Sequence, residues 1–434
     1  MSILIDIPEQ SKSDTIWNFT IKNLPVNKEV IISAEMEDTF GALWRSVAGF
    51  LVPENGEIDL AKHSPIYGNY KTADAMGLIW SMTSENTHGI LARRFDLSPA
   101  TLKIRVFFDG ANQAEKNVTR YIISDLIKQE EIREDGLVGK LYTPGDHSNP
   151  KGAIIVLSGS EGGFRAEQAA LLAQEGYVSL ALAYFNAPEM IGLPTKIKQI
   201  PLEYFQRAIA FLQNHPQVSK HHIAVMGTSR GGELALLLGS TFSEISAVIA
   251  YVPNFAIQAA FGPSDHLNDE VAASWTYKNQ PLPCFPLHVK NVKWFDKSPV
   301  VLKHGFLNTD DIASLQSDNI NPDAIIPVEK INGPVLLLSG GDDQMWPSQN
   351  MSELIMNRLQ RYHHRYLEKS MHLNYPKAGH LIMVPWWPST GYHAIHPVDQ
   401  VDYAFGGNAQ ADAYAGYESW QSIKEFLRTN LNPV

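Results

Sequence analysis

Residues 223–238 read IAVMGTSRGGELALLL, in which an apolar run leads through a glycine-rich turn into strong helix formers. The four apolar residues before Gly227 are typical of a buried parallel strand, and the residues after Gly232 favour a helix. The segment GTSRG at 227–231 fits G-x-S-x-G, the pattern in which a serine lies on a sharp strand-to-helix turn. The pattern therefore predicts a nucleophile, Ser229, on an α/β sheet.

The chemistry that this turn predicts is acyl transfer through a covalent serine ester. The glycines leave room for a tight turn, and the helix N-terminus behind Ser229 favours negative charge that develops during a reaction. A serine in this position can be acylated and then deacylated. A glycine- and serine-rich loop without chemistry is the alternative that the five-residue pattern alone leaves open.

Length, charge and cysteine content restrict the class of protein. The 434 residues predict two domains. A formal net charge of −11 argues against binding to nucleic acid or to anionic membranes, because phosphates would be repelled. The single cysteine, Cys284, permits no intrachain disulfide and no cysteine metal cluster. We expect no metal and no bound cofactor.

Targeting signals are lacking in the sequence as read. The first residues do not form a secretory signal, the last ones do not read Ser-Lys-Leu, and no run approaches the ~20 apolar residues of a membrane span. The expected compartment is the cytoplasm. Composition does not predict an oligomeric state.

Two regions differ in their pattern of elements. Residues 1–118 contain short β-branched and aromatic runs separated by turn residues, which predicts a β-sandwich. Residues 119–434 alternate between strand and helix patterns, which predicts an α/β hydrolase with a doubly wound, mostly parallel sheet. Residues 254–325 interrupt this alternation with prolines and aromatics, and we expect an insertion that borders the active site.

An acid that could orient a histidine follows a predicted strand at 335–339. In α/β hydrolases the chain order is serine, acid, histidine, and an acid past the carboxyl end of a parallel strand is well placed. Asp342 and Asp343 both meet this condition. We favour Asp343 for holding the histidine tautomer, with Asp342 bonding to backbone N–H groups of the loop.

The histidine expected to act as general base is His380, in the sequence AGHLI at 378–382. Its glycine neighbour allows a tight turn, and it follows both acids. Five other downstream histidines are weaker candidates, three of them expected at the surface and two placed after a proline–tryptophan segment: His363, His364 and His372, then His393 and His396.

An oxyanion hole requires two backbone N–H groups. One should belong to Arg230, which follows the nucleophile. The other should come from the loop SGSEGGF at 158–164, from Ser160 or Glu161. Two loop glycines, which let a substrate approach the backbone closely, are expected to bind it: Gly162 and Gly163. A phosphate-binding loop is the alternative, but G-x-x-x-x-G-K-[ST] is absent.

Beyond these motifs, the whole chain resembles the acyl-CoA thioesterase and bile acid-CoA:amino acid N-acyltransferase family. Several strings carry the resemblance, two from the N-terminal part and three from the C-terminal part: LWRS at 43–46, AMGLIWSM at 75–82, SEGG at 160–163, IPVEKI at 326–331 and AGHLI at 378–382. The resemblance implies a β-sandwich followed by an α/β hydrolase, and it supports Ser229, Asp343 and His380 as the catalytic set.

The same resemblance implies an acyl-CoA thioester, or a similar activated acyl group, as substrate. Members with serine at the turn tend towards hydrolysis and members with cysteine towards amino-acid conjugation, so Ser229 favours a thioesterase. Two alternatives stay open, an N-acyltransferase with an amino-acid acceptor and a carboxylesterase on oxygen esters. CoA phosphates would need cations near the entrance, such as Arg165 or Arg230, with an internal ion pair as the alternative for Arg230.

Overall fold

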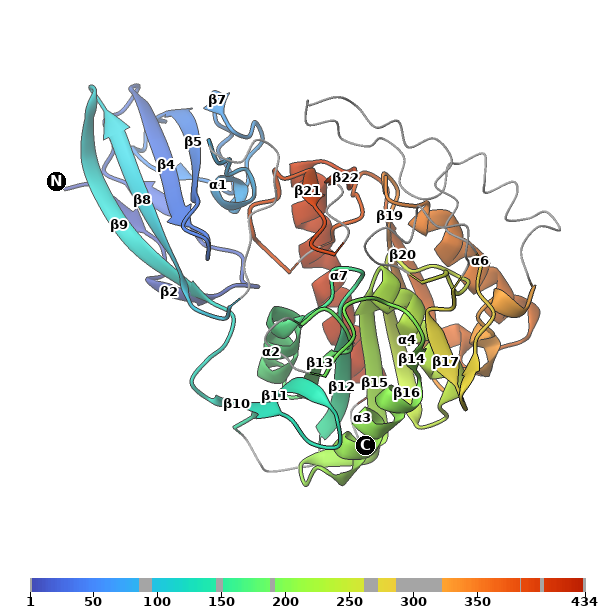
Figure 1. The fold of residues 1–434 in the computed structure, drawn as a ribbon. Helices are drawn as coiled ribbons and strands as arrows, with labels where there is room; N and C mark the ends of the chain where they lie inside the picture. Colours follow the sequence, from blue (N-terminus) through green and yellow to red (C-terminus); the bar gives the residue numbers. More distant parts are fainter. Residues whose placement is uncertain are drawn as a thin grey trace. The chain divides into compact units, whose positions relative to one another are not determined.

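The computed structural model describes residues 2–85, 96–145, 151–187, 192–260, 272–285, 322–382, 384–398 and 402–431. The chain forms two compact units (Figure 1). The first comprises Met1–Ser124 with two C-terminal segments, Met383–Ala394 and Asn408–Tyr417. The second comprises Asp125–Ile382, Ile395–Gly407 and Glu418–Val434.

The boundary between the units differs from the boundary between residues 118 and 119 that the sequence predicted. The first unit ends its N-terminal stretch at Ser124 and also includes the two C-terminal segments, which the sequence did not predict. One helix, α7 (Ala409–Asn430), contributes its first residues to the first unit and its later residues to the second. The described chain thus crosses from one unit to the other more than once.

The first unit contains a six-stranded sheet in the order β2-β9-β8-β4-β5-β7 and a three-stranded sheet in the order β1-β3-β6. The strands and the short helix α1 have these bounds: β1 Leu4–Asp6, β2 Gln10–Lys12, β3 Thr20–Lys22, β4 Glu29–Glu37, β5 Leu43–Leu51, β6 Ile58–Asp59, β7 Tyr67–Gly68, α1 Gly77–Trp80, β8 Ala100–Phe108 and β9 Ala111–Tyr121.

These two sheets share one hydrophobic core. Along β4 every second residue is buried, as expected for a strand with one face on a core. Val30 and Ile32 of β4 cluster with Ile5, Ile21 and Ile58 of the smaller sheet. Side chains from both sheets therefore fill one interior, which is the arrangement of the expected β-sandwich.

The second unit is built on an eight-stranded sheet in the order β10-β11-β13-β12-β15-β16-β19-β20. β10, β11 and β13 pair antiparallel, and all later pairs are parallel. The strands have these bounds: β10 Ile127–Ile132, β11 Val138–Pro144, β12 Lys151–Leu157, β13 Val178–Ala183, β15 Val218–Thr228, β16 Ile245–Tyr251, β19 Val335–Gly340 and β20 Met371–Tyr375.

Helices and smaller elements complete this unit. They have these bounds: α2 Ala166–Gln174, α3 Glu203–Asn214, α4 Arg230–Thr241, α6 Ser348–Arg361, the 3-10 turns Pro322–Ala324, Val328–Lys330 and Leu367–Lys369, and the strands β14 Ile200–Pro201, β17 Trp275–Tyr277, β18 Gln280–Pro281, β21 His393–Ile395 and β22 Asp402–Ala404. β21 begins in the first unit and ends in the second. The alternation of strands with α2, α3, α4 and α6 confirms the expected α/β hydrolase fold.

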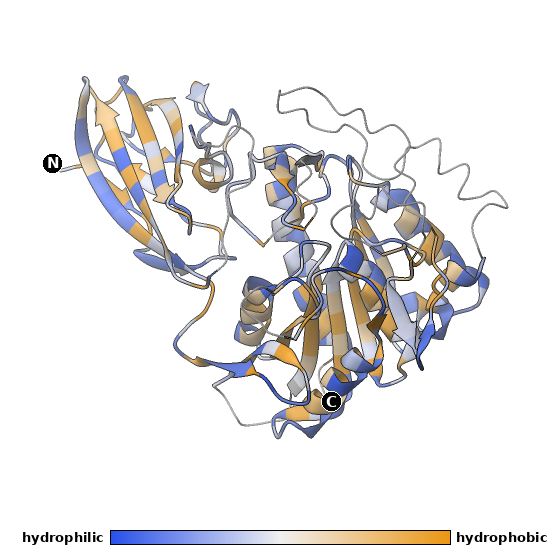
Figure 2. Ribbon diagram, in the orientation of Figure 1, coloured by the Kyte–Doolittle hydropathy of each residue, from blue (hydrophilic) through white to orange (hydrophobic). Residues whose placement is uncertain are grey.

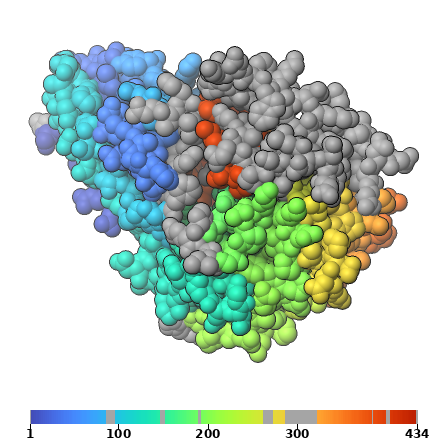
Figure 3. Space-filling view, viewed as in Figure 1, coloured from blue at the N-terminus to red at the C-terminus, as the bar shows by residue number. Residues whose placement is uncertain are grey.

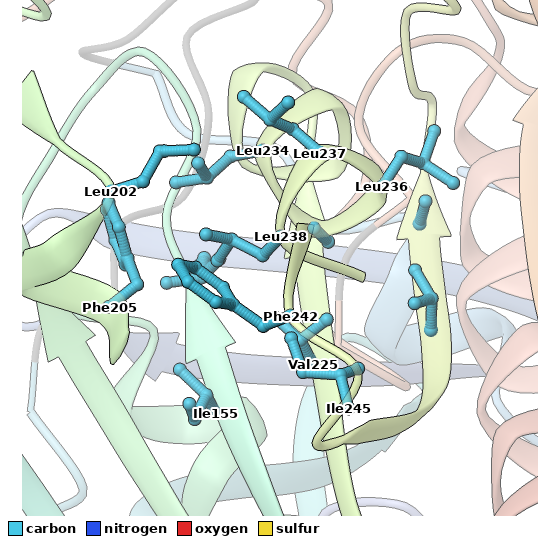
Figure 4. Close-up of a cluster of buried hydrophobic side chains, with 14 of the residues drawn as sticks. Ile155, Leu202, Phe205, Val225, Leu234, Leu236, Leu237, Leu238, Phe242 and Ile245 are labelled. Carbon is cyan, nitrogen blue, oxygen red and sulfur yellow. The ribbon is translucent and has the colours of Figure 1, made fainter. Parts of the chain in front are cut away.

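The central strands of the sheet of the second unit are buried on both faces. β13, β16 and β19 are buried at nearly every residue, which explains their continuous apolar composition. Figure 2 shows this composition as orange along the central strands. Leucines of α4, such as Leu234, pack with Ile155 of β12 and Val225 of β15 in one cluster (Figure 4). The strand and the helix on either side of Ser229 are therefore anchored in the core.

The expected insertion at 254–325 is described only in part, because residues 261–271 and 286–321 lie outside the described residues. In its described part, β17 pairs parallel with β14 and antiparallel with β18. Figure 3 shows this segment in yellow, continuous with the green surface of the preceding residues. Trp275 of β17 is fully buried, so this part of the segment belongs to the core of the second unit.

Candidate active site

Ser229 lies between the end of β15 at Thr228 and the first residue of α4, Arg230. Its backbone has φ 59° and ψ −120°, a conformation that non-glycine residues rarely adopt. The Ser229 N–H donates to the carbonyl oxygen of Tyr251 at 2.9 Å, which ties the turn to the neighbouring strand β16. The strained turn expected of a nucleophile serine is present.

Glycines make this turn sterically feasible. A Cβ atom on Gly227 would lie 2.0 Å from the carbonyl oxygen of Gly231, and one on Gly231 would lie 2.2 Å from that of Ser158. A Cβ on Gly232 would lie 2.7 Å from the oxygen of Tyr251. Backbone atoms at these distances cannot move aside as a side chain could, so the three positions require glycine.

A chain of hydrogen bonds joins Ser229, His380 and Asp343. The distance from His380 Nε2 to Ser229 Oγ is 3.0 Å, and that from His380 Nδ1 to Asp343 Oδ2 is 2.8 Å. The side chains of His380 and Asp343 are 4% and 1% exposed. A carboxylate accepts only, so the ring proton belongs on Nδ1. His380 Nε2 then offers its lone pair to the Ser229 hydroxyl.

The surroundings hold this chain of bonds in place. The second oxygen of Asp343 accepts the N–H groups of Met345 at 2.9 Å and Trp346 at 3.2 Å. The Trp346 ring meets the His380 imidazole edge-to-face, with centroids 5.2 Å apart. The backbone N–H of His380 donates to the carbonyl oxygen of Phe405 at 2.8 Å. Both the acid and the imidazole are thus fixed on several sides.

The two adjacent acids have different partners. Asp343 bonds to His380, whereas Oδ2 of Asp342 accepts the N–H of Gly407 at 3.0 Å. The residue Asp342 is exposed, and its own N–H donates to the carbonyl oxygen of Ala378. The sequence predicted these two sets of partners, with Asp343 bonded to the histidine and Asp342 to a backbone N–H of the loop.

The loop after β12 passes close to the nucleophile. A Cβ on Gly159 would lie 3.2 Å from Cβ of Ser229. The Gly159 N–H donates to a carboxylate oxygen of Glu161 at 3.2 Å, and the Gly162 N–H donates to the Gly159 carbonyl oxygen at 3.3 Å. The Gly163 N–H donates to the carbonyl oxygen of Phe185 at 3.2 Å.

Backbone N–H groups of this loop and of α4 are available as donors to a substrate. In the described part of the chain, the backbone N–H groups of Ser160 and Glu161 have no protein acceptor, in contrast to those of the three loop glycines. The N–H of Arg230, in the first turn of α4, likewise has no carbonyl of its own helix to bond. They are the N–H groups that the sequence predicted for the oxyanion hole, and that role stays a prediction. Gly162 and Gly163 have φ values of +75° and +68°, a region that favours glycine, and their expected contact with substrate stays a prediction.

The side chain of Arg230 is internal. Its guanidinium bonds to Glu233 Oε2 at 2.9 Å, to Gln258 Oε1 at 2.9 Å and to Ser274 Oγ at 2.6 Å, and also to the carbonyl oxygen of Ala259. Only 3% of its side chain is exposed. Of the two readings of Arg230 from the sequence, the structure therefore shows the internal ion pair.

Glu233 is buried behind the nucleophile turn with Arg230. Its carboxylate accepts Trp275 Nε1 at 3.2 Å and the Gln258 N–H at 3.3 Å. Burial raises the pKa of Glu233 to about 7, against the opposing effect of Arg230. This polar cluster connects α4 to the described parts of the segment expected to be an insertion.

Histidine burial differs from the sequence expectation. His364, expected at the surface, is 5% exposed and its Nε2 lies 2.9 Å from the carbonyl oxygen of Ile331. His372 is half-buried, and burial lowers its pKa. His396 is 8% exposed, and its Nε2 lies 3.0 Å from Ser160 Oγ. No motif in the sequence pairs His396 with Ser160, because the two residues lie 236 positions apart.

Arg165, the other arginine expected near the entrance, bonds to Glu161 at 2.6 Å.

Among the described residues, no group of three or more potential ligands could hold a metal ion. None of the helices in the described ranges has the length and apolar character that crossing a membrane requires.

The fold and the bonded Ser229–His380–Asp343 set define an α/β hydrolase with a serine at the nucleophile turn. The chain belongs to the acyl-CoA thioester hydrolase/BAAT family. Residues 200–433 match the family described as BAAT / Acyl-CoA thioester hydrolase C terminal, and residues 14–134 match the Acyl-CoA thioester hydrolase/BAAT N-terminal region. The resemblance seen in the sequence is confirmed.

Similar proteins carry two kinds of name. The chain is 30% identical over 428 residues to acyl-coenzyme A thioesterase 2, mitochondrial, of Mus musculus, covering 96% of this chain and 87% of that protein. It is 29% identical over 440 residues to acyl-coenzyme A amino acid N-acyltransferase 2 of Mus musculus, covering 99% and 97%. Among solved structures, a putative dienelactone hydrolase from Klebsiella pneumoniae has a TM-score of 0.42 at 15% identity, covering 70% of this chain and 98% of that chain.

Proposed function

We propose that this protein hydrolyses acyl-CoA thioesters, with Ser229 as nucleophile, His380 as general base and acid, and Asp343 as the group that orients the imidazole. The observation that carries the proposal is the bonded Ser229–His380–Asp343 set in a chain of this family. A serine hydroxyl is a weak nucleophile unless an adjacent base removes its proton, and His380 Nε2 is 3.0 Å away.

In the acylation step, Ser229 Oγ attacks the thioester carbonyl carbon while its proton passes to His380 Nε2. The carbonyl oxygen becomes an oxyanion, which accepts from the N–H of Arg230 and from that of Ser160 or Glu161. Collapse of this intermediate breaks the carbon–sulfur bond, and the imidazolium protonates the departing CoA sulfur. Asp343 stabilises the imidazolium throughout.

In the deacylation step, His380 takes a proton from water as the water oxygen attacks the ester carbon. The carbon–oxygen bond to Ser229 then breaks, the proton returns to Ser229, and the free acid leaves. Each donor in the oxyanion hole contributes on the order of 3 kcal/mol to stabilising the transition state. All groups in this scheme are protein side chains or backbone amides, so the proposed reaction requires no cofactor.

A second candidate is an N-acyltransferase, in which an amine attacks the acyl-enzyme in place of water. The similarity to a relative named acyl-coenzyme A amino acid N-acyltransferase supports it. The chemistry up to the acyl-enzyme is identical, so access of the acceptor to the ester carbon decides between the two. We favour water, because the serine at the turn points to hydrolysis in the resemblance described above.

The test is a panel of acyl-CoA thioesters of increasing chain length, assayed for CoA release with and without glycine or taurine. We expect CoA and free acid from the wild-type chain and none above background from Ser229→Ala. An amide detected by mass spectrometry when an amino acid is present would establish the acyltransferase. Turnover of simple oxygen esters without CoA release from any thioester would replace the proposal by a carboxylesterase.

The compartment is a separate matter. The mouse relative is named mitochondrial, and the cytoplasm stays a prediction for this chain. Imaging of the tagged full-length protein in its own cell would test it.

A further inference from the structure

The loop that offers the second oxyanion donor is held by a histidine from the far end of the chain. His396 Nε2 lies 3.0 Å from Ser160 Oγ, across 236 residues of sequence. His396 is 8% exposed, and its ring meets Tyr403 at 90° with centroids 5.7 Å apart. A buried ring in contact with an aromatic neighbour has little freedom to turn, so this contact is directional.

The second ring nitrogen determines which way the bond runs. His396 Nδ1 accepts the backbone N–H of Val398 at 3.3 Å. In a neutral imidazole one nitrogen accepts and the other carries the proton. The proton therefore belongs on Nε2, and His396 donates to the hydroxyl oxygen of Ser160.

Ser160 is one of the loop residues whose backbone N–H has no acceptor in the described part of the chain. The residue before it, Gly159, lies against Ser229. A side-chain bond at Ser160 therefore fixes the peptide group that would face the acyl oxygen. Glu161, on the other side, is held by Arg165 at 2.6 Å and by Asn186 Nδ2, which donates to the Glu161 carbonyl oxygen at 2.8 Å.

We propose that His396 is a positioning residue of the oxyanion hole, which keeps the Ser160 backbone N–H aimed at the acyl oxygen through its Nε2–H···Oγ bond. This inference rests on the proposed function, since it assumes that Ser229 is acylated. A donor displaced by about 1 Å can cost up to 10²-fold in rate. We expect a loss of about 10-fold when this bond is removed, because the loop keeps its other contacts.

Two substitutions of the same residue isolate the bond. In His396→Gln the side-chain amide nitrogen reaches the position of Nε2 and can still donate to Ser160. In His396→Asn the shorter amide can accept from Val398 but does not reach Ser160. Each variant would be measured for thermal unfolding, for kcat and KM on acyl-CoA, and for the rate at which a fluorophosphonate labels Ser229.

We expect His396→Asn and Ser160→Ala to lower kcat and the labelling rate by about 10-fold with KM nearly unchanged, because oxyanion donors act in the transition state. We expect His396→Gln to stay close to the wild type. The double variant Ser160→Ala/His396→Asn should lose no more than either single variant, since both remove one contact.

The inference is overturned if His396→Asn reacts like the wild type, or if the losses multiply in the double variant. If His396→Asn does not fold, Ser160→Ala and His396→Gln decide alone: the first must slow labelling and the second must not. Failure of the proposed function is distinguishable, because fluorophosphonate labelling reports on Ser229 and its oxyanion hole whatever the natural acyl group is. A wild-type chain that the probe labels but that releases no CoA contradicts only the thioesterase.

Discussion

Two segments meet at Ser229, and they are held in different ways. The nucleophile turn is held by backbone packing, in which Gly227 and Gly231 leave no space for a side chain. The loop after β12 is held by side chains, with the distant His396 on Ser160 and the nearby Arg165 on Glu161. The glycines of the turn are thus a steric necessity, whereas Ser160 and Glu161 of the loop are held by side-chain hydrogen bonds.

This difference predicts which substitutions near Ser229 the fold can tolerate. A change within the turn meets rigid backbone at the ends of the neighbouring core strands β12 and β16 and must disturb it. A change to the loop removes a polar contact and leaves the sheet intact. We therefore expect turn substitutions to act on folding and loop substitutions to act on rate, with the catalytic groups themselves acting on rate alone.

The largest effect is expected from the nucleophile. Ser229→Ala should lower acyl-CoA turnover by about 10⁶-fold, because no other hydroxyl is bonded to His380 in the described chain. Thermal unfolding should stay close to that of the wild type, since only a hydroxyl is removed. Turnover at the wild-type level would remove Ser229 from the mechanism.

The next largest effect should distinguish the two acids. Asp343→Asn should lower kcat by about 10⁴-fold, because an amide in this position favours the wrong histidine tautomer. Asp342→Asn is the matched control, since its remaining oxygen can still accept from Gly407. Steady-state kinetics of both variants measure the difference. A larger loss in Asp342→Asn than in Asp343→Asn would show that Asp342, and not Asp343, orients the His380 imidazole.

Glycine substitutions compare the turn and the loop directly. Gly231→Ala should destabilise the chain by more than about 3 kcal/mol, because its Cβ would lie 2.2 Å from the Ser158 carbonyl oxygen. Gly163→Ala should cost only about 1–2 kcal/mol, because its φ is +68° but the nearest atom is 3.9 Å away. Urea unfolding measures both, and equal losses would contradict the comparison.

The last comparison concerns the pH dependence of Glu233, which lies behind the turn. Its pKa in the folded chain is about 7, against 4.5 for an unperturbed glutamate. Between these two values the unfolded chain has released this proton and the folded chain has kept it. Its contribution to the free energy of unfolding is therefore complete below pH 4.5 and is lost as the pH rises to about 7.

The matched variant is Glu233→Gln, which is nearly isosteric and does not titrate. The wild-type free energy of unfolding should fall relative to that of Glu233→Gln across this pH window and level off above it. Urea unfolding at a series of pH values measures the difference. Parallel curves would show that Glu233 does not titrate in this range.

Much of the site could be predicted because its signals are local. Strand, turn and helix around Ser229 follow from residues within 223–238, and the steric demand on glycine is expressed there as well. His380 could be singled out by its glycine neighbour and by chain order. The β-sandwich was predictable too, because β4, β5 and β8 keep strand composition and turn residues follow them.

Other features could not be read from the sequence. His364 was expected at the surface, yet it is buried against the Ile331 carbonyl oxygen, since a charged neighbourhood does not show which face of a turn points inwards. The C-terminal segments that join the first unit, including Trp386 in its core, carry no local signal of where they pack.

By itself the sequence predicted the order of elements and singled out Ser229 and His380, because periodicity and glycine placement express local sterics. Only the tertiary structure shows that the favoured acid, Asp343, meets the imidazole, that Arg230 turns inwards to Gln258 and Ser274, and that His396 reaches Ser160. These contacts depend on how segments far apart in the chain pack together, and packing follows from the whole core.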